Sequence, residues 1–362
     1  MSLAAKEQAQ MHERLEQFIR RMPKVELHLH LEGSIRPATL LDLARRHGVE
    51  LPANDVEGLS RWYRFRDFPH FVEIYVAICS CLRDGADFAR ITRELGETAV
   101  AHQVRYAQVA FVPSTHQRFK GMPYDEVWGG IREGAAWVER ELGIRLQFAP
   151  DFPRTRRLGD STRAVEATLE LAIAHRQEGV VALGLGGYET GNPPEPFAEV
   201  FRHAKAHGLR SWPHAGEMDG PASVWGAVRA LGADRIAHGV RAVEDPELLA
   251  YLAEHRIGCD VCPTSNVCLG VYPSIAQHPI RRLIKAGVPV TINSDDPPMF
   301  NTTLLDEFLA LARTQAFTAA ELAALVRTGV EVSFLHEAEK TALRARMDVE
   351  LADAARQAGV DL

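Results

Sequence analysis

The sequence predicts an α/β fold, a (β/α)8 TIM barrel with a helical insertion after its first strand and extra helices at the C-terminus. Two observations lead to this prediction. Eight apolar runs of β-type residues alternate with segments of helical periodicity, which is the pattern of a parallel barrel. The length of 362 residues also suits a barrel, since barrels of this kind remain one domain at this size.

The predicted strands are short apolar runs, and several follow a helix that ends at a glycine, as at His207-Gly208 and Ala286-Gly287. The strand runs are Val25–Leu31, Val104–Pro113, Ile144–Phe152, Val180–Gly187, Arg210–Glu217, Arg235–Val240, Gly258–Asn266 and Val288–Pro297. The helical segments between the later strands are Tyr124–Leu142, Ser161–Gln177, Pro196–His207, Ala222–Leu231 and Pro246–His255.

About seventy residues separate the first two predicted strands, many more than one crossover helix needs. They include three predicted helices, Leu40–Arg46, Phe68–Leu82 and Ala86–Ala101, so the insertion ends at about residues 83–103. An insertion after the first strand emerges at the C-terminal mouth of a barrel, which predicts a lid. After the eighth strand the chain continues as helices over residues 302–362. No linker or low-complexity segment interrupts the chain, so we predict a single domain over residues 1–362.

Composition excludes several classes of partner. The net charge is −7, and no lysine or arginine cluster has the length of a nucleic-acid footprint. No apolar stretch reaches transmembrane length, and the charged, amphipathic segment Lys6–Arg21 lacks the apolar centre of a signal peptide. Five cysteines, an odd number in a long chain, favour reduced thiols and a cytoplasmic location. No obligate protein partner is implied.

The strand Val25–Leu31 carries His28 and His30, which point to the same face because side chains alternate along a strand. Two imidazoles side by side at a strand end form half of a transition-metal site. The alternative is a pair of core histidines satisfied by hydrogen bonds.

Other polar residues also fall at the C-terminal ends of predicted strands. His214 and Glu217 end the fifth strand, His238 ends the sixth, and Asp295 and Asp296 end the eighth. A closed barrel brings these ends around one mouth. Three histidines and an aspartate supply nitrogen and oxygen ligands for Zn²⁺ and leave room for a water, whose pKa the ion lowers.

Glu217 and His238 then form an uncommitted acid–base pair. A carboxyl group in a dry cavity can hold a proton and act as a general acid. The structural alternative for Glu217 is a partner that orients His214. Asp296 directly follows a candidate ligand, and adjacent side chains point differently, so one can bind the metal while the other faces the substrate.

Together these motifs resemble those of the adenosine deaminase family, in the same order from about Lys24 to Glu307. The motifs are His28-Leu29-His30, His214-Ala215-Gly216-Glu217, His238-Gly239, Cys262-Pro263-Thr264-Ser265-Asn266 and Ser294-Asp295-Asp296-Pro297.

The resemblance implies roles for individual residues. One zinc ion is expected on His28, His30, His214 and Asp295. Glu217 is expected to protonate purine N1, and His238 to position or deprotonate the hydroxide that attacks C6. Asp296 is expected at N7, and the backbone N–H of Gly187 at N3. The expected reaction converts the 6-amino group of an adenine nucleoside to a 6-oxo group and releases ammonia.

The substrate within this family stays open. Glu32, at a position associated with the 5′ end of the sugar, and Gly191-Asn192-Pro193-Pro194 resemble the adenine deaminase branch. Asp296-Pro297-Pro298-Met299-Phe300 resembles the nucleoside branch instead. A third branch acts on 6-aminodeoxyfutalosine, a 5′-substituted adenosine that carries a benzoate. We expect a nucleoside, adenosine or a 5′-substituted adenosine, with free adenine as the alternative.

A benzoate calls for an arginine or lysine close to the mouth of the barrel. The candidates are Arg64, Arg66, Arg118, Lys120 and Arg154. Arg64 and Arg66 are the preferred pair, because Trp62, Tyr63 and Phe65 beside them could stack on an aromatic ring.

The sequence does not favour three other interpretations: a zinc knuckle, a phosphotriesterase-like hydrolase and a non-catalytic barrel. Cys259 and Cys262 have the spacing of a zinc knuckle, but no second pair follows, so buried strand thiols are expected. A phosphotriesterase-like hydrolase needs a bridging lysine, and Val180–Gly187 contains none. A non-catalytic barrel would be expected to lack one of the ligands or Glu217, and all are present.

Overall fold

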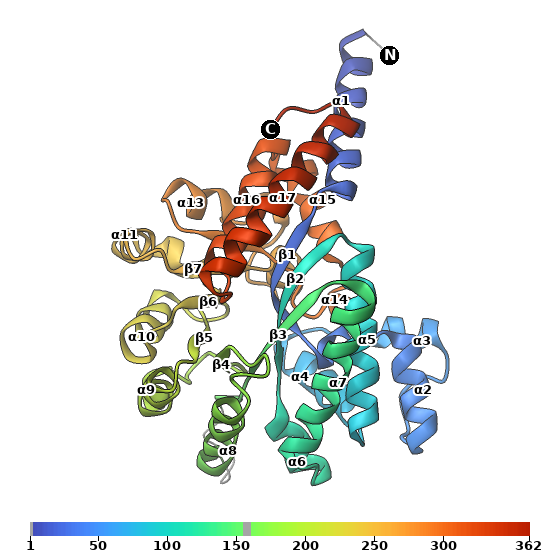
Figure 1. Cartoon of the computed structure of the whole chain (residues 1–362), viewed down its shortest axis with the longest axis vertical. Coiled ribbons are helices and arrows are strands. Elements are labelled where there is room, and N and C mark those ends of the chain that lie inside the picture. The colour runs from blue at the N-terminus through green and yellow to red at the C-terminus, as the bar shows by residue number, and fades with distance from the viewer. Residues whose placement is uncertain (1–2, 155–160) are drawn as a thin grey trace.

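The computed structural model describes residues 3–154 and 161–362. Eight parallel strands follow one another in chain order, three in one sheet and five in a second. Isolated parallel bridges join the two sheets at both seams, Phe148 to Val180 and Leu29 to Asp295. The strands therefore close a ring, and the predicted barrel is confirmed (Figure 1). The strands are β1 (Lys24–His30), β2 (Val104–Phe111), β3 (Arg145–Pro150), β4 (Ala182–Leu185), β5 (Arg210–Ala215), β6 (Arg235–His238), β7 (Gly258–Val261) and β8 (Val290–Ile292).

Helices connect successive strands around the outside of the barrel. They are α6 (Pro113–Lys120), α7 (Tyr124–Leu142), α8 (Ser161–Ala174), α9 (Ala198–Ala206), α10 (Pro221–Leu231), α11 (Pro246–Glu254), α12 (Pro263–Cys268) and α13 (Ile280–Lys285). Short 3₁₀ segments complete the connections at η1 (Glu32–Ser34), η2 (Glu195–Phe197), η3 (Val240–Glu244) and η4 (Ile275–Gln277).

The insertion after β1 is helical, as the sequence predicts. It contains α2 (Pro37–His47), α3 (Val56–Trp62), α4 (Phe68–Cys79) and α5 (Gly85–Ala101). Helix α5 packs closely on α7, because α7 has glycines where the helices meet. A Cβ on Gly130 would lie 2.1 Å from the Gly85 carbonyl oxygen, and one on Gly134 would lie 2.6 Å from the Thr92 Cβ.

The seventh predicted strand is too long. Strand β7 ends at Val261, and Pro263–Asn266 belongs to helix α12 instead. Pro263 stands at the first turn of that helix, where its fixed φ suits the helix and its missing N–H costs nothing. The apolar run Gly258–Cys262 continues into these residues without a glycine stop, so the sequence does not mark the end of the strand.

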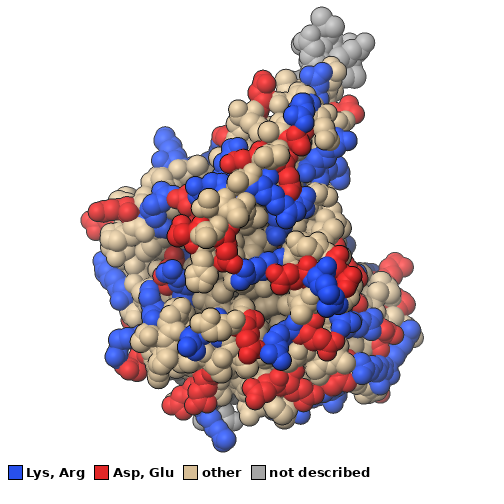
Figure 2. Space-filling view, in the orientation of Figure 1, with Lys and Arg blue, Asp and Glu red and all other residues tan. Residues whose placement is uncertain are grey.

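The N-terminal and C-terminal helices pack against each other at one end of the molecule. Helix α1 (Leu3–Arg21) lies against α15 (Leu304–Gln315), α16 (Ala319–Val332) and α17 (Glu337–Ala358), and extends beyond the barrel at the top of Figure 1. A single-turn helix, α14 (Pro297–Phe300), precedes them at the mouth. Figure 2 shows acidic and basic side chains interspersed over the viewed face. Among the described residues, no helix is long and apolar enough to cross a membrane.

The seam between β1 and β8 is held by side chains as well as backbone. The Asn293 side-chain oxygen accepts hydrogen bonds from the backbone N–H of Leu27 at 2.7 Å and of His28 at 3.1 Å. Beyond it, the His30 N–H donates to the Asp295 carbonyl, and the Asp295 N–H donates to the His28 carbonyl. Three of the expected metal ligands, His28, His30 and Asp295, therefore take part in the backbone contacts that close the barrel.

An ion pair lies inside the barrel below the histidines. The Arg235 guanidinium donates to Asp260 at 2.6 Å, and both side chains are fully buried. Asp260 also accepts from the Trp212 indole at 2.8 Å and from the Thr291 hydroxyl at 2.7 Å. The Trp212 ring in turn packs edge-on against His28, with ring centroids 5.4 Å apart. The network therefore holds Trp212 in place, and Trp212 in turn supports the His28 ring.

We expect Asp260→Asn to lower the free energy of unfolding by about 3–5 kcal/mol, because the Arg235 charge then stays buried without its partner. The matched control is Glu331→Gln, which breaks the exposed ion pair with Arg256. Exposed pairs contribute at most about 1 kcal/mol. Urea unfolding of both variants measures the difference, and equal losses would show that the buried pair has no special weight.

Candidate active site

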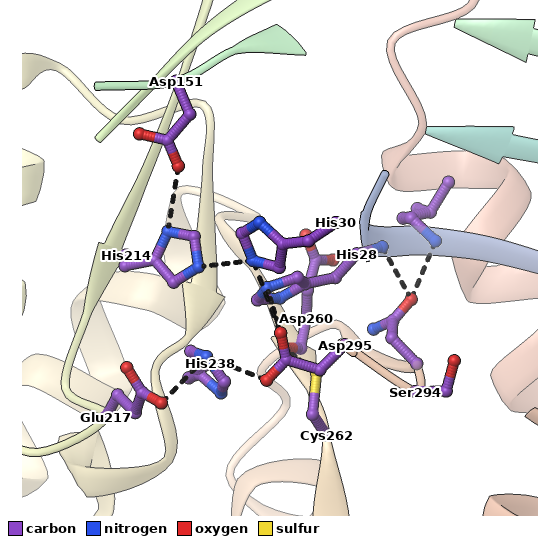
Figure 3. A network of polar contacts seen from close by, with 12 residues as sticks. His28, His30, Asp151, His214, Glu217, His238, Asp260, Cys262, Ser294 and Asp295 are labelled. Carbon is purple, nitrogen blue, oxygen red and sulfur yellow. Dashed lines mark hydrogen bonds and ion pairs between the residues drawn. The ribbon is translucent and has the colours of Figure 1, made fainter. Parts of the chain in front are cut away.

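Four side chains converge at the C-terminal ends of three barrel strands (Figure 3). His28 and His30 come from β1, His214 from β5, and Asp295 from the turn after β8. His30 Nε2 lies 3.3 Å from His214 Nε2 and 3.3 Å from Asp295 Oδ1. His28 Nε2 lies 3.5 Å from the same Asp295 oxygen. Side chains that the sequence distributes over the whole chain therefore meet at one point.

The donor atoms fit a metal ion in both spacing and protonation. A tetrahedral ion with bonds of about 2.0–2.1 Å separates its ligand atoms by about 3.3–3.4 Å, close to the distances above. Burial lowers the pKa of His28 and His214 well below the usual range, and the neighbouring imidazoles lower it further, so both rings are neutral. Neutral imidazoles are the form that binds a metal.

Two of the histidines have a ring nitrogen that is free to bind a metal ion. His28 Nε2 is buried and has no hydrogen-bond partner among the described residues. His214 Nδ1 lies 3.0 Å from the Leu185 carbonyl oxygen, to which it donates, so its Nε2 carries a lone pair. His28, His30 and His214 form one group of potential ligands, and Asp295 joins two overlapping groups.

The backbone is strained at Asp295, one of the potential ligands, and at His238 beside it. His238 and Asp295 have φ angles of 65° and 66°, in the left-handed region that side chains other than glycine seldom occupy. Such conformations are found at functional sites, where the surrounding structure enforces them. At Asp295 the backbone bonds to β1 supply that enforcement.

Glu217 lies beside the potential ligands without being one of them. Its Oε1 is 3.4 Å from His238 Nε2, and its side chain is buried. Burial raises the pKa of Glu217 well above its usual value, and the negative charges of Asp295 and Glu189 add to this effect. The raised pKa favours the protonated form, which a general acid needs.

His238 has a defined orientation. The Asn266 side-chain amide donates to Nδ1 at 3.3 Å, and the Asn266 oxygen accepts from His278 at 3.1 Å. A neutral His238 therefore carries its proton on Nε2, which faces Glu217 and the second oxygen of Asp295 at 3.7 Å. This arrangement suits a donor that holds a water or hydroxide in place.

Asp296 lies close to Asp295 and lines the same cavity. Its Oδ1 is buried and has no partner among the described residues. A Cβ on Gly33 would lie 1.5 Å from that oxygen, so only glycine fits there. Burial raises the pKa of Asp296 well above its usual value, with Asp295 as the next cause. In its protonated form the side chain can donate a hydrogen bond to a ligand.

These side chains form the floor of a cavity of about 380 Å³. Helices α4 and α6 of the region above the mouth supply one wall, which is largely apolar. Gly187, with φ of 81°, lines the opposite wall beside Asp151 and Pro153. The wall residues from the two helices are Phe68, Phe71, Val72, Tyr75, Val76, Thr115, Arg118 and Phe119.

Glu32 does not line this cavity. It is fully buried, and its carboxylate accepts hydrogen bonds from Tyr75 at 3.1 Å, from the Val112 N–H at 3.0 Å and from His116 at 2.9 Å. The 3₁₀ turn η1 after β1 directs the side chain towards α4 and α6. Glu32 therefore ties the cavity wall to the first strand, a role different from the substrate contact that the sequence suggests.

Of the five basic residues that the sequence suggests for binding a benzoate, Arg118 is the one that lines the cavity. Arg64 and Arg66 are exposed and lie outside the lining. The aromatic residues beside them are used by the fold: Tyr63 donates to the Ile35 carbonyl, and Phe65 packs against Phe71 and Phe300. The preference for Arg64 and Arg66 is not supported.

The remaining candidates also lie elsewhere. Lys120 is exposed outside the lining. Arg154 is buried and donates to the carbonyl oxygens of Asn192 and His214, so it supports the loop behind the ligand. All five cysteines are free. Cys259 and Cys262 are buried as expected, although Cys262 follows strand β7 and precedes α12.

The sequence analysis missed Asp151 and Glu189. Asp151 follows β3, lines the cavity, and has one buried oxygen without a partner among the described residues. Glu189 lies four residues after β4 and bonds to the loop that carries Glu217. Both stand just beyond strand ends, where barrel active sites form, and that position was the available signal.

The sequence profile of a family described as adenosine deaminase matches residues 23–350. An aminodeoxyfutalosine deaminase from Streptomyces avermitilis is 40% identical over 336 residues, which cover 92% of each protein. An adenine deaminase from Cupriavidus necator is 40% identical over 331 residues, 91% of this chain and 92% of that protein.

A solved structure is similar over nearly the whole fold. It is an amidohydrolase from Burkholderia ambifaria with bound Zn, 29% identical, with a TM-score of 0.86. The match covers 96% of this chain and 95% of that one.

Proposed function

Since this chain belongs to the adenosine deaminase family, we propose that it removes the 6-amino group of a purine nucleoside by hydrolysis at one bound zinc ion. The chain is an enzyme that acts on an adenine derivative, as its family and its relatives at 40% identity establish. The observation that carries the proposal is the meeting of four potential ligands beside the buried Glu217, whose pKa is raised by burial. The ligands are His28, His30, His214 and Asp295.

Zinc is the ion that we propose for the site, one per chain. Three imidazoles and one carboxylate are donors that zinc takes in catalytic sites, and a structural relative holds Zn. A zinc ion in this donor set supplies the Lewis acidity that makes water a nucleophile near neutral pH.

Two side chains act directly in the reaction, one by transferring a proton and the other by holding the attacking water. Glu217, protonated because it is buried among negative charges, donates its proton to purine N1 as C6 is attacked. His238 holds the attacking water through Nε2, on the side of Glu217 and Asp295. The two protons of the attacking water balance the reaction: one restores the Glu217 carboxyl group, and the other goes to the amino group, which leaves as ammonia. The ring keeps a 6-oxo group and the proton on N1.

The purine is oriented by groups on two walls. Asp296, whose buried Oδ1 has no partner among the described residues, donates to N7. The backbone of Gly187 approaches the opposite edge at N3, where a left-handed φ and the nearby Pro153 exclude a side chain. A bicyclic base held at N1, N3 and N7 has its C6 over the floor of the cavity.

The walls beyond the base support an extended substrate. A volume of about 380 Å³ lies within the range of roughly 300–1,000 Å³ typical of ligand sites. Val72, Phe119 and Tyr188 are apolar side chains left exposed around the entrance, and the Arg118 guanidinium lies over the Phe119 ring, 5.2 Å from its centre. Arg118 has no ion pair with any described residue. We take the substrate to be a 5′-substituted adenosine that carries a carboxylate, such as 6-aminodeoxyfutalosine.

The test compares kcat/KM for 6-aminodeoxyfutalosine, adenosine and adenine, with and without Arg118→Met. A charge-assisted hydrogen bond contributes about 1.5–3 kcal/mol, so the variant should lose about 10- to 100-fold on the carboxylate substrate alone. Activity on adenosine should stay within about twofold. Lys120→Met is the matched control, since Lys120 is exposed on the same helix outside the cavity lining.

Other outcomes decide between the alternatives. Equal turnover of adenosine and the extended nucleoside would show that the extension is not read, and the substrate is then adenosine. Turnover of adenine alone would exclude both nucleosides. A loss on all three substrates would place Arg118 in the structure of the wall and not at the ligand.

A further inference from the structure

The loop that carries Glu217 is organised around one buried carboxylate. Glu189 is 1% exposed, and it accepts hydrogen bonds from four consecutive backbone N–H groups. These are the N–H groups of Gly216 at 2.6 Å, Glu217 at 3.0 Å, Met218 at 2.7 Å and Asp219 at 2.9 Å. The Ser223 hydroxyl donates as well.

The local backbone makes this convergence possible. Gly216 has φ of 65°, which turns the chain immediately after β5 so that successive N–H groups point the same way. A Cβ at this position would also lie 2.5 Å from Val224 Cγ2, so the turn requires glycine. The five donors are shared between the two Glu189 oxygens, two on Oε1 and three on Oε2, and each carboxylate oxygen can accept more than one hydrogen bond.

The loop is thereby fixed at the base of the Glu217 side chain. The backbone N–H of Glu217 itself is one of the donors, and its carboxyl group reaches His238 at 3.4 Å. No other side chain among the described residues accepts from these four N–H groups. Arg241 bonds to the carbonyl oxygens of Gly216 and Met218, so Glu189 is the acceptor that holds the N–H side of the loop.

We propose that Glu189 is the positioning residue for the general acid: by holding the backbone of residues 216–219, it places the Glu217 carboxyl group where substrate N1 arrives. The proposal rests on the proposed function, in which Glu217 is the proton donor. Glu189 itself does not line the cavity and does not touch the substrate.

The charge of Glu189 acts in the same direction. After burial and Asp295, it is the third cause that raises the pKa of Glu217. Glu189 therefore supports both the place of the acid and its protonated form.

The first experiment compares Glu189→Gln with Glu195→Gln, a matched change at an exposed glutamate six residues later. Misplacement of a reacting group by about 1 Å can cost about 100-fold in rate. We expect Glu189→Gln to lower kcat by about 10- to 100-fold, with KM and metal content unchanged. Glu195→Gln should behave as the native chain. A wild-type kcat in Glu189→Gln would overturn the proposal.

A double-mutant cycle separates positioning from general support of the fold. If Glu189 acts through Glu217, adding Glu189→Gln to Glu217→Gln should change kcat by less than about twofold, because the acid is already absent. An equal loss in both backgrounds would show a structural role and refute the proposal. Full activity of Glu217→Gln alone would instead refute the proposed function, so the two failures are distinct.

Ser223→Ala covers the case in which Glu189→Gln does not fold or loses its metal. It removes one of the five donors and leaves the carboxylate in place. We expect kcat to fall by about two- to fivefold with KM unchanged, and no further fall in the Glu217→Gln background. No change in the native background would count against the proposal.

Discussion

We expect replacement of Glu217 by glutamine to lower kcat by about 10²–10⁴-fold, with the metal content unchanged. The amide has nearly the same shape as the protonated acid, but it cannot transfer a proton to the ring nitrogen. Glu217 is buried, and its pKa is raised by burial and by the charges of Asp295 and Glu189, so the native side chain carries that proton near neutral pH. Steady-state kinetics with parallel metal analysis measures both effects.

Asp219→Asn is the control for this variant. Asp219 lies two residues away on the same loop, outside the cavity lining, and its side-chain oxygen accepts from the Gly220 N–H, which asparagine can also do. We expect kcat within about twofold of the native value. If Glu217→Gln kept its activity but lost its metal, Glu217 would be a support for His214 and not the acid.

The second large effect is on metal binding. We expect His214→Ala to lose both the metal and the activity, because one of four donors and its bond to the Leu185 carbonyl disappear together. His238→Ala should retain about one ion per chain and lose about 100-fold in kcat, because the attacking water is no longer aligned. Elemental analysis of protein purified without added metal gives the ion content of each.

His238 makes this comparison informative, because its Nε2 is close enough to His28 and Asp295 to belong to a potential ligand group. Loss of the metal in His238→Ala would identify it as a ligand and require that one of the four be reassigned. Full activity of the native chain after complete chelation would contradict the metal-dependent reaction itself.

The barrel and the strand-end residues are predictable from sequence because both depend on local patterns. Alternation of strands and helices fixes which ends share a mouth, so His28, His214 and Asp295 meet although they lie far apart in the chain. The family comparison adds the activity.

Side-chain direction in irregular segments is not predictable in the same way. Glu32 turns away from the cavity because a 3₁₀ turn follows β1, and Arg118 replaces Arg64 because the aromatic neighbours of Arg64 pack into the fold. Glu189 meets its partners 27 to 30 residues later in the chain, a contact that no local spacing reveals. The left-handed backbone of His238 likewise has no signature in a residue that is not glycine.

The contacts between β1 and β8 determine at which stage of folding the site forms. Leu27 and Asn293 are 266 residues apart, and their bond belongs to the contacts that close the ring and aim His28 and Asp295 at each other. Nearly the whole chain must be synthesised before the two halves of the ligand set can meet. Closing so long a loop is slow, and it rewards the chain only when the last strand docks. An ion that needs all four ligands binds only the closed barrel. Its binding therefore stabilises the closed barrel relative to forms in which β1 and β8 have not yet paired.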